Sequence, residues 1–145
     1  MQKSPTWQDL IKINEYLYEI PQSFRQDMRV PARLYMTEAM FQDIEEDLSL
    51  LQLVNVASLP GIQKYALAMP DIHQGYGFPI GGVAATAIQE GGVISPGGID
   101  YDINCGVRLL VANMHKDDIK SQIAVLATAL FHTIPSGVGR GGKIS

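Results

Sequence analysis

The chain has 145 residues, of which 46% are hydrophobic and 18% charged, and its formal net charge is −4. This composition excludes a mostly disordered chain, and no stretch reads as a membrane span of ~18 apolar residues or as a secretory signal. The single cysteine excludes an internal disulfide and indicates a reducing, cytoplasmic setting. The excess of 15 acidic over 11 basic residues argues against a basic coat for nucleic acid, but it leaves room for a local phosphate site.

The glycines and the acidic residues divide the chain into two regions. None of the 14 glycines precedes Gly61, whereas residues 1–60 carry nine of the 15 acidic residues. We therefore predict a helical front over residues 1–60 and a glycine-rich strand region over residues 61–145, which also carries the candidate metal-site motif.

Two helices are predicted in the front. The first begins near Trp7 and ends at Pro21, because its apolar residues recur at roughly helical spacing: Leu10, Ile11, Tyr16, Leu17 and Ile20. The second begins after Thr37 and buries Met40, Phe41, Ile44 and Leu48 on one face. Its four acids, Asp43, Glu45, Glu46 and Asp47, are interpreted as a solvated face and not as a cation site.

The pattern changes from helical to extended after Lys64. We predict strands at 65–69, ended by Pro70, at 83–88 and at 107–111, and a final amphipathic helix over 117–131 with Asp117 and Asp118 in its first turn. Helices combined with short strands predict an α+β fold, in which helices pack on a mixed or antiparallel sheet.

The first segment that departs from core requirements is residues 69–82. A strand leads into a turn that contains Asp71, His73 and four glycines, and such turns allow main-chain N–H groups to face a ligand. The spacing matches neither a dinucleotide-binding loop nor a P-loop. His73 alone is more typical of a hydrogen-bonded structural residue than of a ligand.

The second such segment is residues 95–108, in which carboxylates, an amide and the only thiol converge before an apolar strand. Asp102 and Cys105 together would suit a transition metal, but they supply only two ligands. Spacing alone favours Cys105 as a small buried residue. A nucleophilic Cys105, activated by Arg108, is a further alternative without a supporting family signature.

Taken together, these segments resemble the RtcB family of RNA-splicing ligases. The strings MPDIHQGYGFPIGGVAA at 69–85, GIDYDINCGVR at 98–108 and IPSGVG at 134–139 look like three blocks of that family in the right order. The resemblance is close over residues 60–145 and looser over the first 60. It implies an RtcB-like fold of which this chain is an N-terminal and incomplete part, and we expect the glycine-rich tail to continue into further sequence.

The resemblance also implies an activity. Members of this family join RNA 3′-phosphate or 2′,3′-cyclic phosphate ends to 5′-hydroxyl ends in tRNA splicing and RNA repair, using GTP and manganese (Mn²⁺). By resemblance, Asp102 and Cys105 hold manganese. Their spacing before the 107–111 strand predicts that both open to the same cavity as the Asp71–Gly75 turn, with Asp100 and Asn104 as supporting or turn-holding residues. The histidine that becomes guanylylated would lie beyond Ser145, and archease-type proteins serve as activators.

Because the remaining ligands and the nucleophile would lie elsewhere, the 145-residue chain alone is expected to be catalytically inactive. We also expect residues after Ile134 to be poorly anchored, and apolar surface to be exposed and to cause self-association. A non-catalytic metal-binding or interaction module on the same scaffold is the alternative function, and a cysteine hydrolase is a third.

Overall fold

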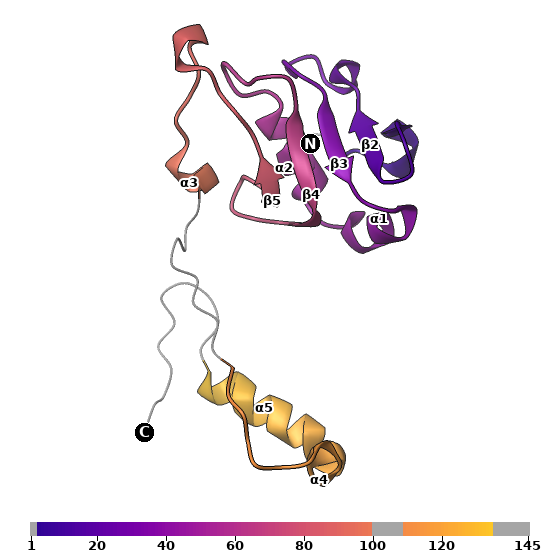
Figure 1. Cartoon of the computed structure of the whole chain (residues 1–145), viewed down its shortest axis with the longest axis vertical. Helices are drawn as coiled ribbons and strands as arrows, with labels where there is room; N and C mark the ends of the chain where they lie inside the picture. The colour runs from indigo at the N-terminus through magenta and orange to yellow at the C-terminus, as the bar shows by residue number, and fades with distance from the viewer. Residues whose placement is uncertain (1–2, 100–108, 135–145) are drawn as a thin grey trace. The chain divides into compact units, whose positions relative to one another are not determined.

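The computed structural model describes residues 3–99 and 109–134. The chain divides into two compact units, Met1–Asn104 and Cys105–Ser145, which are described separately. Figure 1 shows the sheet and its helices in the first unit, and helices α4 (Lys116–Ile119) and α5 (Ile123–Thr133) in the second.

The first unit is built on a mixed five-stranded sheet in the order β1-β2-β3-β4-β5. Only β3 and β4 pair in parallel, and the other neighbours are antiparallel. A parallel pair needs a crossover connection, which the two helices between β3 and β4 provide. The predicted α+β architecture is therefore confirmed. The strands are β1 (Ile11–Lys12), β2 (Leu17–Ile20), β3 (Ala32–Tyr35), β4 (Ala66–His73) and β5 (Ile80–Val83).

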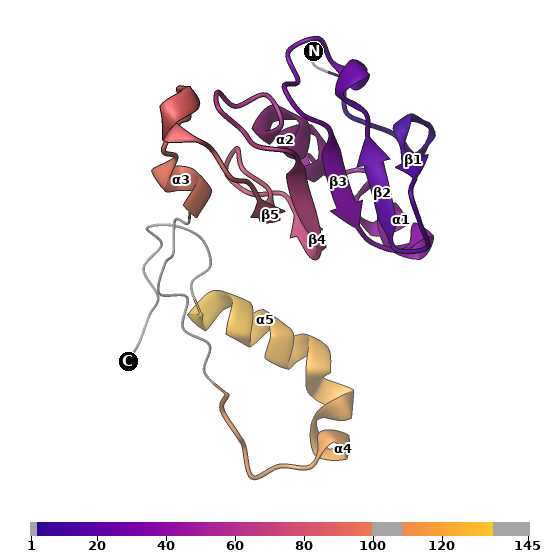
Figure 2. The ribbon, with the colours of Figure 1, turned by 45° about the horizontal axis from the view of Figure 1, so that its top comes forward.

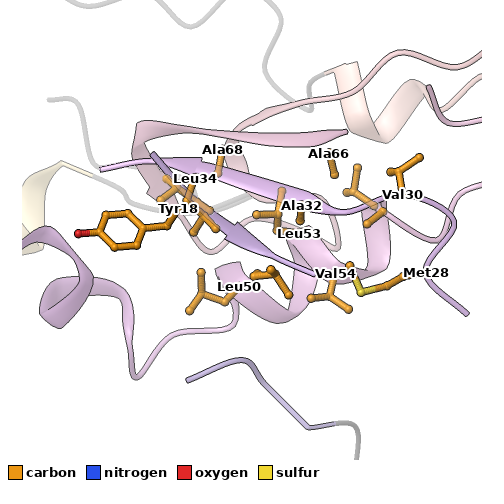
Figure 3. Close-up of a cluster of buried hydrophobic side chains, with 14 of the residues drawn as sticks. Tyr18, Met28, Val30, Ala32, Leu34, Leu50, Leu53, Val54, Ala66 and Ala68 are labelled. Carbon is orange, nitrogen blue, oxygen red and sulfur yellow. The ribbon is translucent and has the colours of Figure 1, made fainter. Parts of the chain in front are cut away.

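The core lies between one face of this sheet and helix α2 (Ser49–Val56), which Figure 2 shows running along the sheet. In β3, Ala32 and Leu34 are buried while the residues that alternate with them are not, as expected for a strand with one covered face. In α2, Leu50, Leu53 and Val54 have no exposed surface. Figure 3 shows the side chains of the two elements meeting in one cluster.

The predicted helix from Trp7 to Pro21 is wrong. The segment forms a 3-10 turn (η1, Trp7–Asp9) followed by the antiparallel pair β1 and β2. Asn14 turns the chain, because its side-chain Oδ1 accepts a hydrogen bond from the Tyr16 backbone N–H at 2.9 Å. Pairing of β2 with β3 then buries Tyr18 and Ile20. The apolar spacing of this segment fits a helix as well as it fits strands, and the pairing of β2 with β3 decides in favour of strands.

The predicted second helix is confirmed over α1 (Glu38–Ile44), with the Thr37 hydroxyl accepting a hydrogen bond from the Met40 N–H at 3.4 Å. The prediction is wrong for Leu48, which lies beyond the end of α1 and is exposed. The chain then turns and starts α2 at Ser49, a separate helix that the sequence pattern does not distinguish. The front therefore holds three strands as well as two helices. Asp43, Glu45 and Glu46 are exposed, as predicted, whereas Asp47 is only half-exposed and has a different role.

The predicted strands are partly wrong. Strand β4 continues through Pro70 to His73, with an irregular register between Ala68 and His73 that accommodates a residue without an N–H. Strand β5 begins three residues earlier than the predicted one and ends at Val83. Of the remaining predicted strand, residues 84–87 contribute an isolated bridge between Ile62 and Thr86, and Ile88 starts a helical turn. Two short helical turns follow, η3 (Ile88–Glu90) and α3 (Pro96–Ile99), and η2 (Gln22–Phe24) lies earlier in the chain.

The second unit contains α4 (Lys116–Ile119), η4 (Lys120–Gln122) and α5 (Ile123–Thr133). These confirm most of the predicted final helix, including Asp117 and Asp118 in its first turn. The predicted strand at 107–111 is wrong for 109–111, which have no regular structure, and 107–108 lie outside the described residues. No side chain of residues 109–134 is buried, so the expected apolar exposure is found there, while self-association stays a prediction. No helix of the described residues is long and apolar enough to cross a membrane.

Candidate functional site

The glycine-rich segment between β4 and β5 is the described part of the chain for which the sequence predicts a ligand-facing turn. Strand β4 carries Asp71 and His73 to its end, and β5 returns with Ile80 opposite His73. The connection from Gln74 to Pro79 is therefore a turn at one end of the sheet. The sequence predicted a turn here, but Asp71 and His73 belong to β4 and two of the four glycines belong to β5, so the turn itself holds only Gly75 and Gly77.

The imidazole of His73 is oriented by its own strand. Its Nδ1 lies 2.8 Å from the backbone carbonyl oxygen of Asp71. Because a carbonyl oxygen only accepts, Nδ1 carries the hydrogen, and Nε2 of the neutral ring is left with a lone pair. His73 thus makes the hydrogen bond of a structural histidine, on a side chain that is exposed.

Helix α2 holds the turn through a buried side chain. Gln52 is 7% exposed, and its amide makes two hydrogen bonds with Gly75: Nε2 donates to the carbonyl oxygen at 2.7 Å, and Oε1 accepts from the N–H at 3.0 Å. Both polar ends of the side chain are thereby satisfied by one backbone residue of the turn.

A second contact comes from the residue that precedes α2 by two positions. One carboxylate oxygen of Asp47 accepts from the Ser49 N–H at 2.7 Å, and the other accepts from the Gln74 N–H at 3.1 Å. Asp47, which the sequence analysis assigned to a solvated helix face, therefore connects the start of α2 to the glycine-rich turn.

The turn needs glycine at position 75. A β-carbon there would lie 2.2 Å from the carbonyl oxygen of Phe78, closer than real contacts allow. Absence of a side chain lets the backbone fold back on itself while Gln52 approaches from the helix.

Two open pockets, each of about 270 Å³, lie beside the turn and share Leu59, Phe78, Ser95 and Gly98 in their walls. Their remaining described walls include no Asp, Glu, His, Lys or Arg. They offer apolar and aromatic surface with a few small polar groups, and not a charged cavity.

Asp102 and Cys105, the predicted metal ligands, lie outside the described residues, as do Asp100, Asn104 and Arg108. Their expected position next to the Asp71–Gly75 turn stays a prediction. Residues 3–99 and 109–134 contain no group of three or more His, Cys, Asp or Glu side chains that could hold a metal ion.

Sequence reasoning did not find Gln52 and Asp47. The available signal was the isolated amide of Gln52 within the apolar run from Leu50 to Val54, where a side chain that only packs would be aliphatic. Asp47 gave no signal distinct from the neighbouring acids.

Comparison with known proteins identifies relatives. A family model described as "tRNA-splicing ligase RtcB" matches residues 52–145. Curated proteins named "tRNA-splicing ligase RtcB" include one from Aeropyrum pernix, 51% identical over 134 residues, and one from Methanococcus maripaludis, 52% identical over 133 residues. Each alignment covers 92% of this chain but only 28% and 27% of the respective relative.

Proposed function

Since the chain belongs to the RtcB family of tRNA-splicing ligases, we propose that it forms the N-terminal part of an RNA ligase. The proposed reaction joins an RNA 3′-phosphate or 2′,3′-cyclic phosphate end to a 5′-hydroxyl end, with GTP and manganese as cofactors. The observation that carries the proposal is that the family match, residues 52–145, includes the glycine-rich turn and the Asp102–Cys105 motif together.

Asp102 and Cys105 are the proposed manganese ligands in this chain. A carboxylate and a thiolate fit a borderline transition metal, and two ligands are fewer than such an ion takes. We assign the remaining ligands to the parts of the longer family members that this chain does not span. Bound manganese would neutralise phosphate charge at the reacting RNA ends.

The glycine-rich turn is the proposed RNA-facing element of this chain. His73 presents a nitrogen lone pair at an exposed position, and the turn is held on its inner side by α2. Nε2 of His73 can accept a hydrogen bond from a ribose hydroxyl or, when protonated, donate one to a phosphate oxygen. We also propose that an archease-type protein activates the ligase and that the ligase is located in the cytoplasm.

An end-joining assay tests this function on the full-length ligase that carries the segment. One RNA pair has 2′,3′-cyclic phosphate and 5′-hydroxyl ends, and the control pair has 3′-hydroxyl and 5′-phosphate ends. We expect joining of the first pair only, dependent on GTP and Mn²⁺, and no joining by the 145-residue chain alone. Joining of the control pair, or joining without GTP, would contradict the proposal. Mn²⁺ binding without any joining would favour a non-catalytic metal-binding module.

A further inference from the structure

Packing alone does not explain why Gln52, with its polar amide, occupies a buried position in α2. Apart from Ser49, the other buried residues of α2, among them Leu53 and Val56, are apolar, and an aliphatic side chain would fill the same space without a polar group to satisfy. The amide instead matches the backbone of Gly75 at both ends, with a donor facing a carbonyl oxygen and an acceptor facing an N–H. The side chain therefore fixes the two peptide groups on either side of the Gly75 α-carbon, 74–75 through the N–H and 75–76 through the carbonyl oxygen.

Asp47 adds a second fixed point at the adjacent residue. Its carboxylate joins the Ser49 N–H, at the first turn of α2, to the Gln74 N–H. Hydrogen bonds to an ionised carboxylate are stronger than those between neutral groups. Gln74 and Gly75 are thus held by three hydrogen bonds from the α2 side, and the turn cannot shift relative to the helix without breaking them.

His73 immediately precedes these two residues. The Asp71 carbonyl sets the rotation of its ring, and the fixed backbone of Gln74 and Gly75 sets where the strand end lies. We infer that Gln52 and Asp47 are positioning residues of the ligase, which hold Gln74 and Gly75, the first two residues of the 74–79 turn, in the geometry that meets RNA. This inference rests on the proposed function. Gln52 does not touch substrate itself, because it is buried and its amide is engaged by Gly75.

The kinetic test uses the full-length ligase with Gln52→Met, which keeps the volume and removes both hydrogen bonds. A displacement of about 1 Å in a substrate-contacting element costs up to about 100-fold in rate. We expect kcat for RNA joining to fall about 10- to 100-fold, with KM for RNA changed by less than about 3-fold. Asp47→Ala is expected to lower kcat in the same direction. The matched control is Ser49→Ala, a buried polar residue of the same helix whose hydroxyl has no partner among the described residues.

A direct readout of the hydrogen bonds accompanies the kinetics. In the 145-residue chain, the Gly75 amide should exchange with solvent about 10-fold faster in Gln52→Met than in the parent, while core amides of β3 keep their protection. Parental kcat in a folded Gln52→Met enzyme, or unchanged Gly75 exchange, would overturn the inference. If the parental enzyme joins no RNA, the ligase assignment fails, and Gly75 exchange alone decides whether Gln52 holds the turn.

Discussion

A β-carbon at Gly81 would lie 2.7 Å from the Oδ1 atom of Asp71, and the backbone of Gly81 has a φ of +75°. Strand β5 can therefore pass beside the acid of the glycine-rich segment only because position 81 lacks a side chain. The sequence placed Asp71 and Gly81 in one motif, and the structure shows that the motif brings the two residues into contact distance across β4 and β5.

Gly81→Ala is expected to lower the free energy of unfolding by about 1–3 kcal/mol, because it adds a left-handed backbone penalty to a clash with Asp71. Urea unfolding of the 145-residue chain measures the difference. Gly91→Ala is the matched control, since its φ is +74° but nothing lies within 4 Å of its β-carbon position. Equal losses for the two variants would show that the approach to Asp71 costs nothing.

Ser49→Ala is expected to leave stability unchanged or to raise it by up to about 1 kcal/mol. The Ser49 side chain is fully buried, and its hydroxyl has no hydrogen-bond partner among the described residues. Removing an unsatisfied buried polar group recovers its desolvation cost. A loss of more than about 1 kcal/mol in urea unfolding would indicate a partner for this hydroxyl.

Leu53→Ala is expected to lower the free energy of unfolding by about 2–5 kcal/mol, because Leu53 has no exposed surface in the core between α2 and the sheet. Leu48→Ala, at a side chain 48% exposed, is the control and should cost much less. Similar losses for the two variants, measured by urea unfolding, would contradict the placement of the core.

The stability of the N-terminal turn should depend on pH through Asp9. Hydrogen bonds from the Thr6 hydroxyl and backbone N–H, and then from Lys3, hold the pKa of Asp9 below its ordinary value of 3.8. Because the pKa of Asp9 is lower in the folded chain than in the unfolded chain, the ionised carboxylate stabilises the fold above pH 3.8. This stabilisation is lost as the pH falls through the pKa of the folded state.

The free energy of unfolding of Asp9→Asn should therefore be lower than that of the parent at pH 7. The difference should be no more than about 1 kcal/mol, because the Lys3–Asp9 pair is close to solvent. The difference should shrink below pH 3.8. Thermal unfolding at several pH values measures it, with Asp43→Asn as an exposed control for the loss of charge. A pH-independent difference would show that Asp9 acts without its ionisation.

Local sequence patterns predict some helices and strands of this fold correctly and fail for others. The helices after Thr37 and around Asp117 were predictable, because caps and an apolar stripe agree there. The region from Leu10 to Ile20 was not, because its apolar spacing fits a helix or a pair of strands, and pairing with β3 decides between them. Pro70 ended a strand in the pattern, but an irregularity in the β4–β5 register lets the strand continue.

In the candidate site too, features that depend on one segment could be predicted from the sequence, and contacts between distant segments could not. The turn between β4 and β5 follows from residues within one segment, so the sequence could indicate it, whereas the Asp71 carbonyl partner of His73 is known only from the structure. The contacts of Gln52 and Asp47 join residues 23 and 27 positions apart, and no local pattern specifies them. The roles of Asp102 and Cys105 rest on the resemblance to the family and stay predictions.

The most direct test of the central claim is RNA joining by Asp102→Ala and Cys105→Ala variants of the full-length ligase at saturating Mn²⁺. Asp43→Ala, an exposed carboxylate of α1, serves as the control. We predict that each ligand variant loses at least about 100-fold in joining of 2′,3′-cyclic phosphate to 5′-hydroxyl ends, while the control keeps parental activity. Near-parental joining by either ligand variant would contradict the assignment of Asp102 and Cys105 to the manganese site.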